Sequence, residues 1–141
     1  PHGYLSDEQL IFLKEKLQEF PNKYTLIAVH HHVLPIGAAW LDQHILKNNT
    51  QLIELISQFT NVKAVLSGHV HQAFDVISKG VRYLTSPSTC VQFKPNSNDF
   101  AVDNKEPGYR YLVLKQSGEI ETQVERIDAG EFVIDENATG Y

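Results

Sequence analysis

Two groups of histidines provide the most informative chemistry in this sequence. One is the run H-H-H at residues 30–32, and the other is the pair His69 and His71 in the stretch S-G-H-V-H-Q. Imidazole is a common ligand for divalent transition metals, and Gly68 lets the backbone turn so that both members of the pair can face one centre. Either group alone is weak evidence for a metal site, because surface and hydrogen-bonded histidines follow the same spacing.

Each histidine group follows an apolar segment that is expected to form a β-strand. Tyr24 to Val29 and Val62 to Leu66 are short, β-rich and mostly apolar, as in strands buried on both faces of a parallel sheet. Between them, apolar positions from Leu52 to Phe59 predict an amphipathic helix that is capped near Asn49 or Thr50. The order strand, helix, strand predicts parallel pairing through a right-handed crossover. Because ligands of such sheets gather at the carboxyl ends of the strands, the two histidine groups are expected to meet.

The remaining elements are predicted from capping and turn chemistry. Ser6 and Gln9 form a capping box, so a helix should begin there, and it should end before Pro21. Residues 73–85 and 109–127 each contain two β-rich runs around a short turn with glycine, which predicts two hairpins. The expected fold class is therefore α/β, mixed with antiparallel α+β features.

Two segments give little secondary-structure signal. Residues 86–108 contain three prolines and few periodic apolar positions, so they are expected to form a long loop, and long ordered loops are often functional. The tail at 128–141 is too polar to assign. We treat residues 1–141 as one domain that carries a C-terminal tail.

The composition excludes several classes of protein. A length of 141 residues with 42% hydrophobic residues is enough for one core. The net charge of -5 argues against nucleic acid as a partner, because phosphate backbones are held by clustered Lys and Arg. No apolar run approaches the roughly 20 residues that span a bilayer, and the single cysteine, Cys90, cannot form an internal disulfide. With no leader at Pro1, these features predict a cytoplasmic protein without a membrane partner.

Three segments resemble a known enzyme family. They are H-H-H-V-L-P-I-G-A-A-W-L-D-Q from His30 to Gln43, S-G-H-V-H-Q from Ser67 to Gln72, and S-P-S-T-C-V-Q-F-K-P from Ser86 to Pro95. In these segments the chain resembles the calcineurin-like metallophosphoesterases and, within them, the bacterial 3′,5′-cyclic AMP phosphodiesterases. Relatives usually have proline where this chain has Val33, a departure that affects no ligand.

The resemblance implies both a fold and a metal site. The fold would be the C-terminal half of a four-layer α/β/β/α sandwich, with two divalent metal ions at the strand ends. Iron or manganese is preferred to zinc for these ions. By position, His30 and His69 would bind one metal, and His71 would bind the other and contact the substrate. His31 and His32 would then lie beside the ligands as supporting or wall residues.

The resemblance also shows which parts of the family's site this chain lacks. The family takes its other ligands and its catalytic histidine from an N-terminal half, so this chain is expected to be a partial domain with no catalytic residue. Alone, it should be inactive, and exposed sheet edges should favour self-association. The local Asp42-Gln43-His44 follows no strand, and we interpret it as structural rather than metal-binding. Like His2, His44 is expected to be solvated.

The activity implied for the complete protein is hydrolysis of cyclic AMP to 5′-AMP. Trp40 and the segment from Ser86 to Phe93 are candidates for shaping the nucleotide pocket, although such residues are more often turn and packing residues. Two alternatives remain open at this point. One is a phosphodiesterase of the same superfamily acting on a glycerophosphodiester or another nucleotide, and the other is a non-catalytic metal-binding module.

Overall fold

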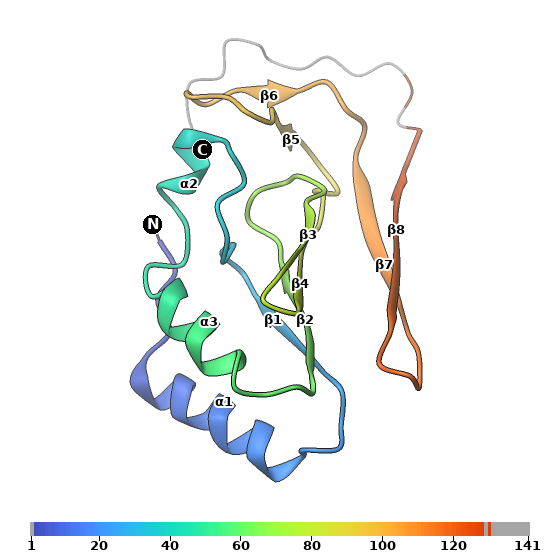
Figure 1. Ribbon diagram of the computed structural model, residues 1–141. Helices are drawn as coiled ribbons and strands as arrows, with labels where there is room; N and C mark the ends of the chain where they lie inside the picture. The colour runs from blue at the N-terminus through green and yellow to red at the C-terminus, as the bar shows by residue number, and fades with distance from the viewer. Residues whose placement is uncertain (1, 129, 131–141) are drawn as a thin grey trace.

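The computed structural model describes residues 2–128 and 130, and Figure 1 shows their arrangement. Its helices are α1 (Asp7–Glu19), α2 (Ala39–Asp42) and α3 (Asn49–Ile56). Its strands are β1 (Thr25–Val29), β2 (Val62–Ser67), β3 (Asp75–Ser78), β4 (Val81–Thr85), β5 (Gln92–Phe93), β6 (Val102–Asp103), β7 (Gly108–Leu114) and β8 (Ile120–Arg126).

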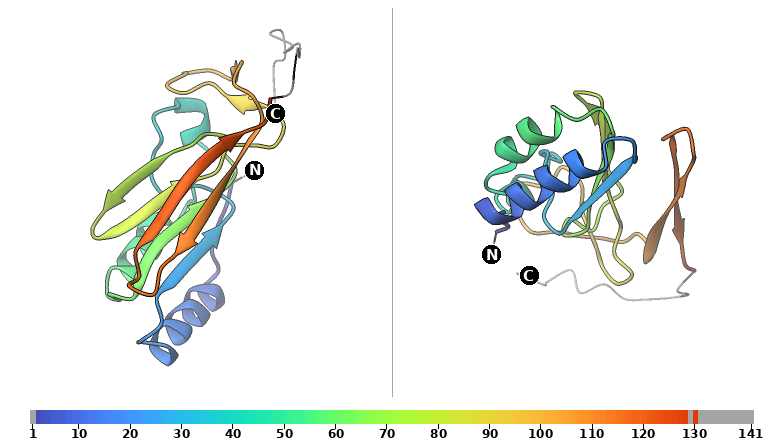
Figure 2. Two further views of the ribbon diagram at one scale, coloured as in Figure 1. Left: turned by 90° about the vertical axis from the view of Figure 1, so that its right-hand side faces the viewer. Right: turned by 90° about the horizontal axis from the view of Figure 1, so that it is seen from below.

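A four-stranded mixed sheet lies at the centre of the fold. Its strand order is β1-β2-β4-β3, with β1, β2 and β4 parallel and β3 antiparallel to β4. The predicted parallel pairing of β1 with β2 is therefore confirmed. The helices α1 and α3 cover one face of the sheet (Figures 1 and 2), and their buried side chains Leu17, Leu52 and Ile56 pack against Val65 of β2. The mixed α/β fold class is also confirmed.

The hairpin of β7 and β8 lies against the opposite face of the sheet, as both views in Figure 2 show. Arg110 of β7 connects the two layers, because its guanidinium donates to the carbonyl oxygens of Thr85 and Phe74 at 2.9 and 3.3 Å. Arg82 of β4 donates to the carbonyl oxygen of Ile120. The described residues thus form three layers of the expected sandwich, in the order helices, sheet, hairpin.

Several boundaries differ from the sequence prediction. The capping box at Ser6 is present as predicted, but α3 begins after Asn48, whose side-chain oxygen accepts the amide of Leu5 at 3.0 Å, so the helix has no side-chain cap. In β1, Ala28 is exposed, so this strand is not buried on both faces. The predicted loop at 86–108 contains the short β5–β6 pair, which is too brief to produce an apolar period.

The sequence also predicted an unassigned C-terminal tail and no segment that spans a membrane. The tail at 128–141 lies almost wholly outside the described residues. Among those described, no helix has the length and apolar character needed to cross a membrane.

Candidate metal centre

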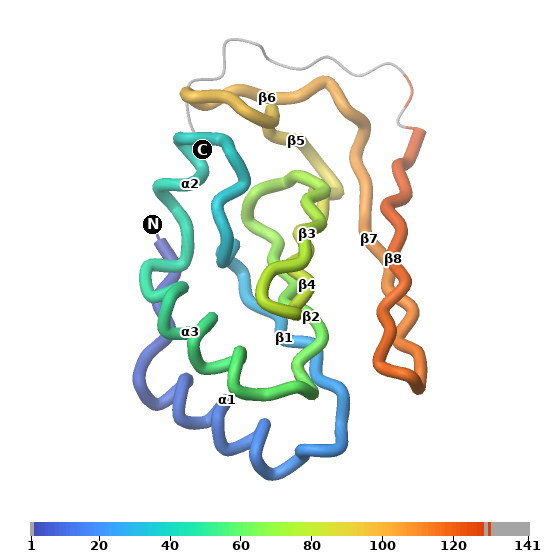
Figure 3. Tube along the Cα trace, viewed as in Figure 1, coloured from blue at the N-terminus to red at the C-terminus, as the bar shows by residue number. Residues whose placement is uncertain are grey.

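The carboxyl ends of β1 and β2 bring the two histidine groups together. The carbonyl oxygen of His30 accepts hydrogen bonds from the amides of Gly68 and His69, both at 3.1 Å. These two bonds continue the parallel pairing of the strands beyond the sheet. Figure 3 shows that both strands run toward the end of the molecule that carries α2, β5 and β6. The predicted meeting of the groups follows directly from this main-chain connection.

Three imidazoles form a group that could hold a metal ion. One ring nitrogen each of His30, His31 and His69 lies within 4.8 Å of the others. In particular, Nδ1 of His69 is 3.3 Å from Nε2 of His30. Two nitrogens bound to one ion at about 2.1 Å each are about 3.0 to 3.4 Å apart, so this pair fits a shared ion. No carboxylate belongs to the group in the part of the chain that the structure describes.

His31 is a member of this group, although the sequence analysis placed it beside the ligands. Its Nδ1 lies 2.8 Å from the carbonyl oxygen of His44, so Nδ1 carries the proton and donates it. The lone pair is then on Nε2, the state that a metal ligand requires. Gly3 packs against the other side of the ring, and a Cβ there would lie 2.7 Å from Cδ2 of His31. The position of this imidazole is therefore closely defined.

His71 lies outside the group of three, in a distinct environment. Its Nδ1 is 3.0 Å from the carbonyl oxygen of Val91, which again leaves the lone pair on Nε2. Its ring stacks on Phe93 with a centroid separation of 4.4 Å and an angle of 5°. The backbone of His71 has φ of 50°, a left-handed conformation that costs a non-glycine residue about 1 kcal/mol or more. The strained backbone at His71 is therefore part of the turn that places this ring against Phe93 and the carbonyl oxygen of Val91.

Asp42 is not a member of the three-histidine group, and its carboxylate instead makes hydrogen bonds to the loop before α2 and to His32. Its carboxylate accepts the amides of Ile36 and Gly37 at 2.9 and 3.1 Å and lies 3.3 Å from Nε2 of His32. His32 is 1% exposed and stacks beside His69 at 6.4 Å. These contacts agree with a structural role for the Asp42-Gln43-His44 segment.

The side chain of His44 is partly buried and so less solvated than expected, whereas His2 is exposed as expected. The ring of His44 lies 5.7 Å from that of His69, and its carbonyl oxygen orients His31. No sequence pattern indicated this role, because the oxygen belongs to the main chain.

Burial controls the protonation of the centre. Burial, followed by the neighbouring imidazoles of His31 and His30, lowers the pKa of His69 to about 3. Burial also lowers the pKa values of His31 and His71, against the opposing effect of their carbonyl partners. At neutral pH these rings are therefore neutral and keep a lone pair for a metal.

The metal-free protein is expected to lose stability as the pH falls below 6.5. The pKa of His69 is about 3 in the folded protein and 6.5 in the unfolded chain. Between these values the unfolded chain binds a proton that the folded protein does not, so the free energy of unfolding decreases as the pH falls toward 3. Urea unfolding at pH 7, 5.5 and 4 with a chelator measures this slope. The His69→Asn variant should show a smaller slope, and an equal slope would contradict the assignment.

The two segments proposed to shape a nucleotide pocket have different environments. Trp40 donates from Nε1 to Oγ of Ser97 at 3.1 Å and packs edge-on against Phe93 at 5.0 Å. It therefore supports the ring of Phe93. In the segment from Ser86 to Phe93, the side chain of Gln92 is buried and bonds to both the amide and the carbonyl group of Ser88, which fixes the loop.

Curated relatives match the chain over its whole length. A 3′,5′-cyclic adenosine monophosphate phosphodiesterase from Vibrio vulnificus is 51% identical over all 141 residues, which are 52% of that protein. The Escherichia coli K12 protein of the same name is 45% identical over the whole chain and 51% of its own length. A 3′,5′-cyclic-nucleotide phosphodiesterase from a Nostoc species is 43% identical over 89% of the chain. The chain spans about half the length of these relatives.

The fold has a counterpart among solved structures. A dimetal phosphatase from Danio rerio superposes with a TM-score of 0.55 and 22% identity, covering 77% of this chain and 34% of that one. At this identity the likeness concerns the fold alone. No protein-family model matches the chain. The identities over the whole chain nevertheless confirm the resemblance noted in the sequence: along its whole length the chain is similar to the bacterial 3′,5′-cyclic AMP phosphodiesterases, of which it spans about half.

Proposed function

We propose that this chain is the C-terminal half of a metal-dependent phosphodiesterase that converts cyclic AMP to 5′-AMP. Residues 1–141 would then form one partial domain. The observation that carries the proposal is the group of three imidazole nitrogens within 4.8 Å at the carboxyl ends of two parallel strands. The names of the relatives supply the substrate class.

The proposal assigns a role to each imidazole. His30 and His69 hold one metal, since their facing nitrogens are 3.3 Å apart. His71 holds the second metal and borders the bound substrate. His31 supports the first metal position, with its proton kept on Nδ1 by the carbonyl oxygen of His44. Imidazole sites accept iron, manganese or zinc, and we favour iron or manganese.

The chemistry that two divalent ions supply in such a site is activation of water and neutralisation of charge on the phosphoryl group. The residues of this chain contribute preorganisation. Protons stay on Nδ1 of His31 and His71, and burial keeps His69 neutral. The ring of His71 is held by its stack on Phe93, so it cannot turn away from the substrate side.

Additional groups are needed for turnover. The group of three imidazoles contains no carboxylate among the described residues, and nothing in it can protonate a leaving oxygen while the rings stay neutral. In the proposal these groups come from the remainder of the full-length protein, since the chain spans about half of its relatives.

The test is hydrolysis by the full-length protein that contains this chain. After metal removal, the protein is loaded with manganese, and 5′-AMP formation from cyclic AMP is followed by chromatography. We expect turnover of cyclic AMP to exceed that of glycerophosphodiesters and bis(p-nitrophenyl) phosphate. Faster turnover of either other diester would favour a phosphodiesterase with a different substrate. One tightly bound zinc with no hydrolysis would favour a non-catalytic metal-binding module.

A further inference from the structure

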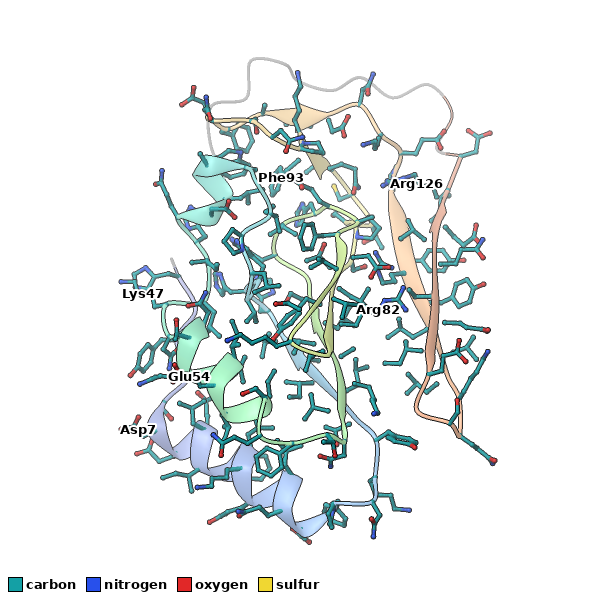
Figure 4. The ribbon with its side chains drawn as sticks, in the orientation of Figure 1. Asp7, Lys47, Glu54, Arg82, Phe93 and Arg126 are labelled. Atoms are coloured by element: carbon teal, nitrogen blue, oxygen red, sulfur yellow. The ribbon has the colours of Figure 1, made fainter. Side chains whose placement is uncertain are left out.

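A pocket of about 330 Å³ lies directly beside His71. It extends from the turn after β2 toward the β5–β6 pair and the end of β8. Figure 4 shows Phe93 and Arg126, two of its lining residues, near this end of the molecule on different elements. Its volume is at the lower end of the range for small-molecule sites, which is about 300 to 1,000 Å³. A second hollow, between Tyr24 and Leu114, measures only about 40 Å³ and cannot hold an organic ligand.

Three of the twelve lining residues, His71, Phe74 and Phe93, carry aromatic rings. Phe93 is 1% exposed and is held between His71 and Trp40 by ring contacts at 4.4 and 5.0 Å. Phe74 forms part of the opposite lining, and its amide is fixed by Oγ1 of Thr85 at 2.9 Å. A flat heteroaromatic group fits such walls better than a compact ion does.

The charges of the pocket do not favour a phosphate group as its ligand. Two cations line it, but Nζ of Lys105 is 3.0 Å from the carboxylate of Asp103, which also lines it. Arg126 already donates to the carbonyl oxygen of Glu106. The net charge of the lining is therefore about +1. Phosphate sites, in contrast, usually bring together several cationic side chains that have no carboxylate partner. A neutral polar ligand is the better match.

One of the lining residues also has an unsatisfied side-chain amide. Gln72 lines the pocket and is 9% exposed, and its buried Nε2 has no hydrogen-bond partner among the described residues. A buried donor without a partner is unfavourable, because it has lost its hydrogen bonds to water. The terminal torsion of glutamine is soft, so the amide can turn toward an acceptor without moving the backbone. Glutamine amides pair well with the ring nitrogen and amino group of adenine.

We propose that this pocket binds the purine base of a cyclic nucleotide, and that Gln72 determines specificity by hydrogen bonding to the base. The inference rests on the proposed function, because His71 then lies between the phosphodiester and the base. The purine lies against the aromatic lining residues, and the Gln72 amide gains a partner that the described residues do not supply. Asp103 and Lys105 neutralise one another at the far side.

The test uses the full-length, metal-loaded protein and two substrates. Cyclic AMP needs the pocket, whereas methyl p-nitrophenyl phosphate is a diester without a base. Gln72→Met removes the amide at similar size, and Ala73→Trp fills the pocket from an exposed lining position. Gln58→Met and Gln58→Trp are matched controls at an exposed position outside the pocket. Binding of adenosine, which has no phosphate, is measured in parallel by calorimetry.

We expect both pocket variants to lower kcat/KM for cyclic AMP about tenfold or more relative to the small diester, mainly through KM. Adenosine should bind the wild-type protein and the Gln58 variants but not Ala73→Trp. An equal loss on both substrates, no loss on either, or adenosine binding that Ala73→Trp leaves intact would overturn the inference. If the wild-type protein hydrolyses only the small diester, the proposed cyclic AMP activity fails, and adenosine binding alone then decides the pocket.

Discussion

The His69→Ala variant of the full-length protein is expected to lose most of its bound metal and to lower kcat for cyclic AMP more than about a hundredfold. Residues that merely orient metal ligands already contribute about 10- to 100-fold, and a ligand should contribute more. His69 is 7% exposed, its Nδ1 faces Nε2 of His30 at 3.3 Å, and burial lowers its pKa to about 3. Removal of its ring therefore removes a neutral donor from the buried group of three. Metal content by atomic emission and steady-state kinetics measure both effects.

The matched control is His2→Ala, since His2 is exposed and lies outside the group of three. It should retain metal and activity. His30→Ala and His71→Ala should behave like His69→Ala, and His32→Ala should have a much smaller effect. If His31→Ala abolished metal binding while His30→Ala did not, the ligand assigned after β1 would be wrong by one residue.

The isolated 141-residue chain is expected to show no hydrolysis of cyclic AMP with manganese. Among the described residues, one group of three imidazoles could hold a single ion, and His71 lies outside that group. Without a carboxylate to bridge a second ion in the described residues, the charge on the phosphoryl group cannot be neutralised from two sides. Incubation of the purified chain with manganese and cyclic AMP, followed by chromatography of 5′-AMP, measures this directly.

Weak binding of one ion should persist in this isolated chain and should depend on His30 and His69. Size-exclusion chromatography would reveal the expected self-association through unpaired strand edges. Metal-dependent turnover that His71→Ala abolishes would mean that the chain carries a complete site, and the proposal of a half-enzyme would be wrong.

The sequence predicted those elements of the fold that have strong local patterns. The apolar runs before His30 and before Ser67, with a helical period between them, were sufficient for β1, α3 and β2. The pairing of β4 beside β2 was not predicted, because parallel neighbours depend on contacts far apart in the sequence. The two-residue strands β5 and β6 have no measurable period. Their position is set by the pairing of Phe93 with Val102.

The histidines of the candidate site were predictable from residue type and from their position after strands. The environment of each ring was not. His31 was expected beside the ligands, yet it joins His30 and His69, because the carbonyl oxygen of His44 directs its ring. The stack of His71 on Phe93 depends on the fold of the segment after β4. Such contacts join residues about 13 to 22 positions apart through loops, for which sequence periodicity carries no information.

The imidazoles of His31 and His71 are both oriented by main-chain oxygens, those of His44 and Val91. A main-chain oxygen is present whatever side chain a residue carries, so these two positions can change identity during evolution without loss of the bond. The spatial path of the backbone is what must be preserved. Insertions or deletions at 33–43 or 72–90 would displace the oxygens, and these loops are thus constrained in length more than in sequence.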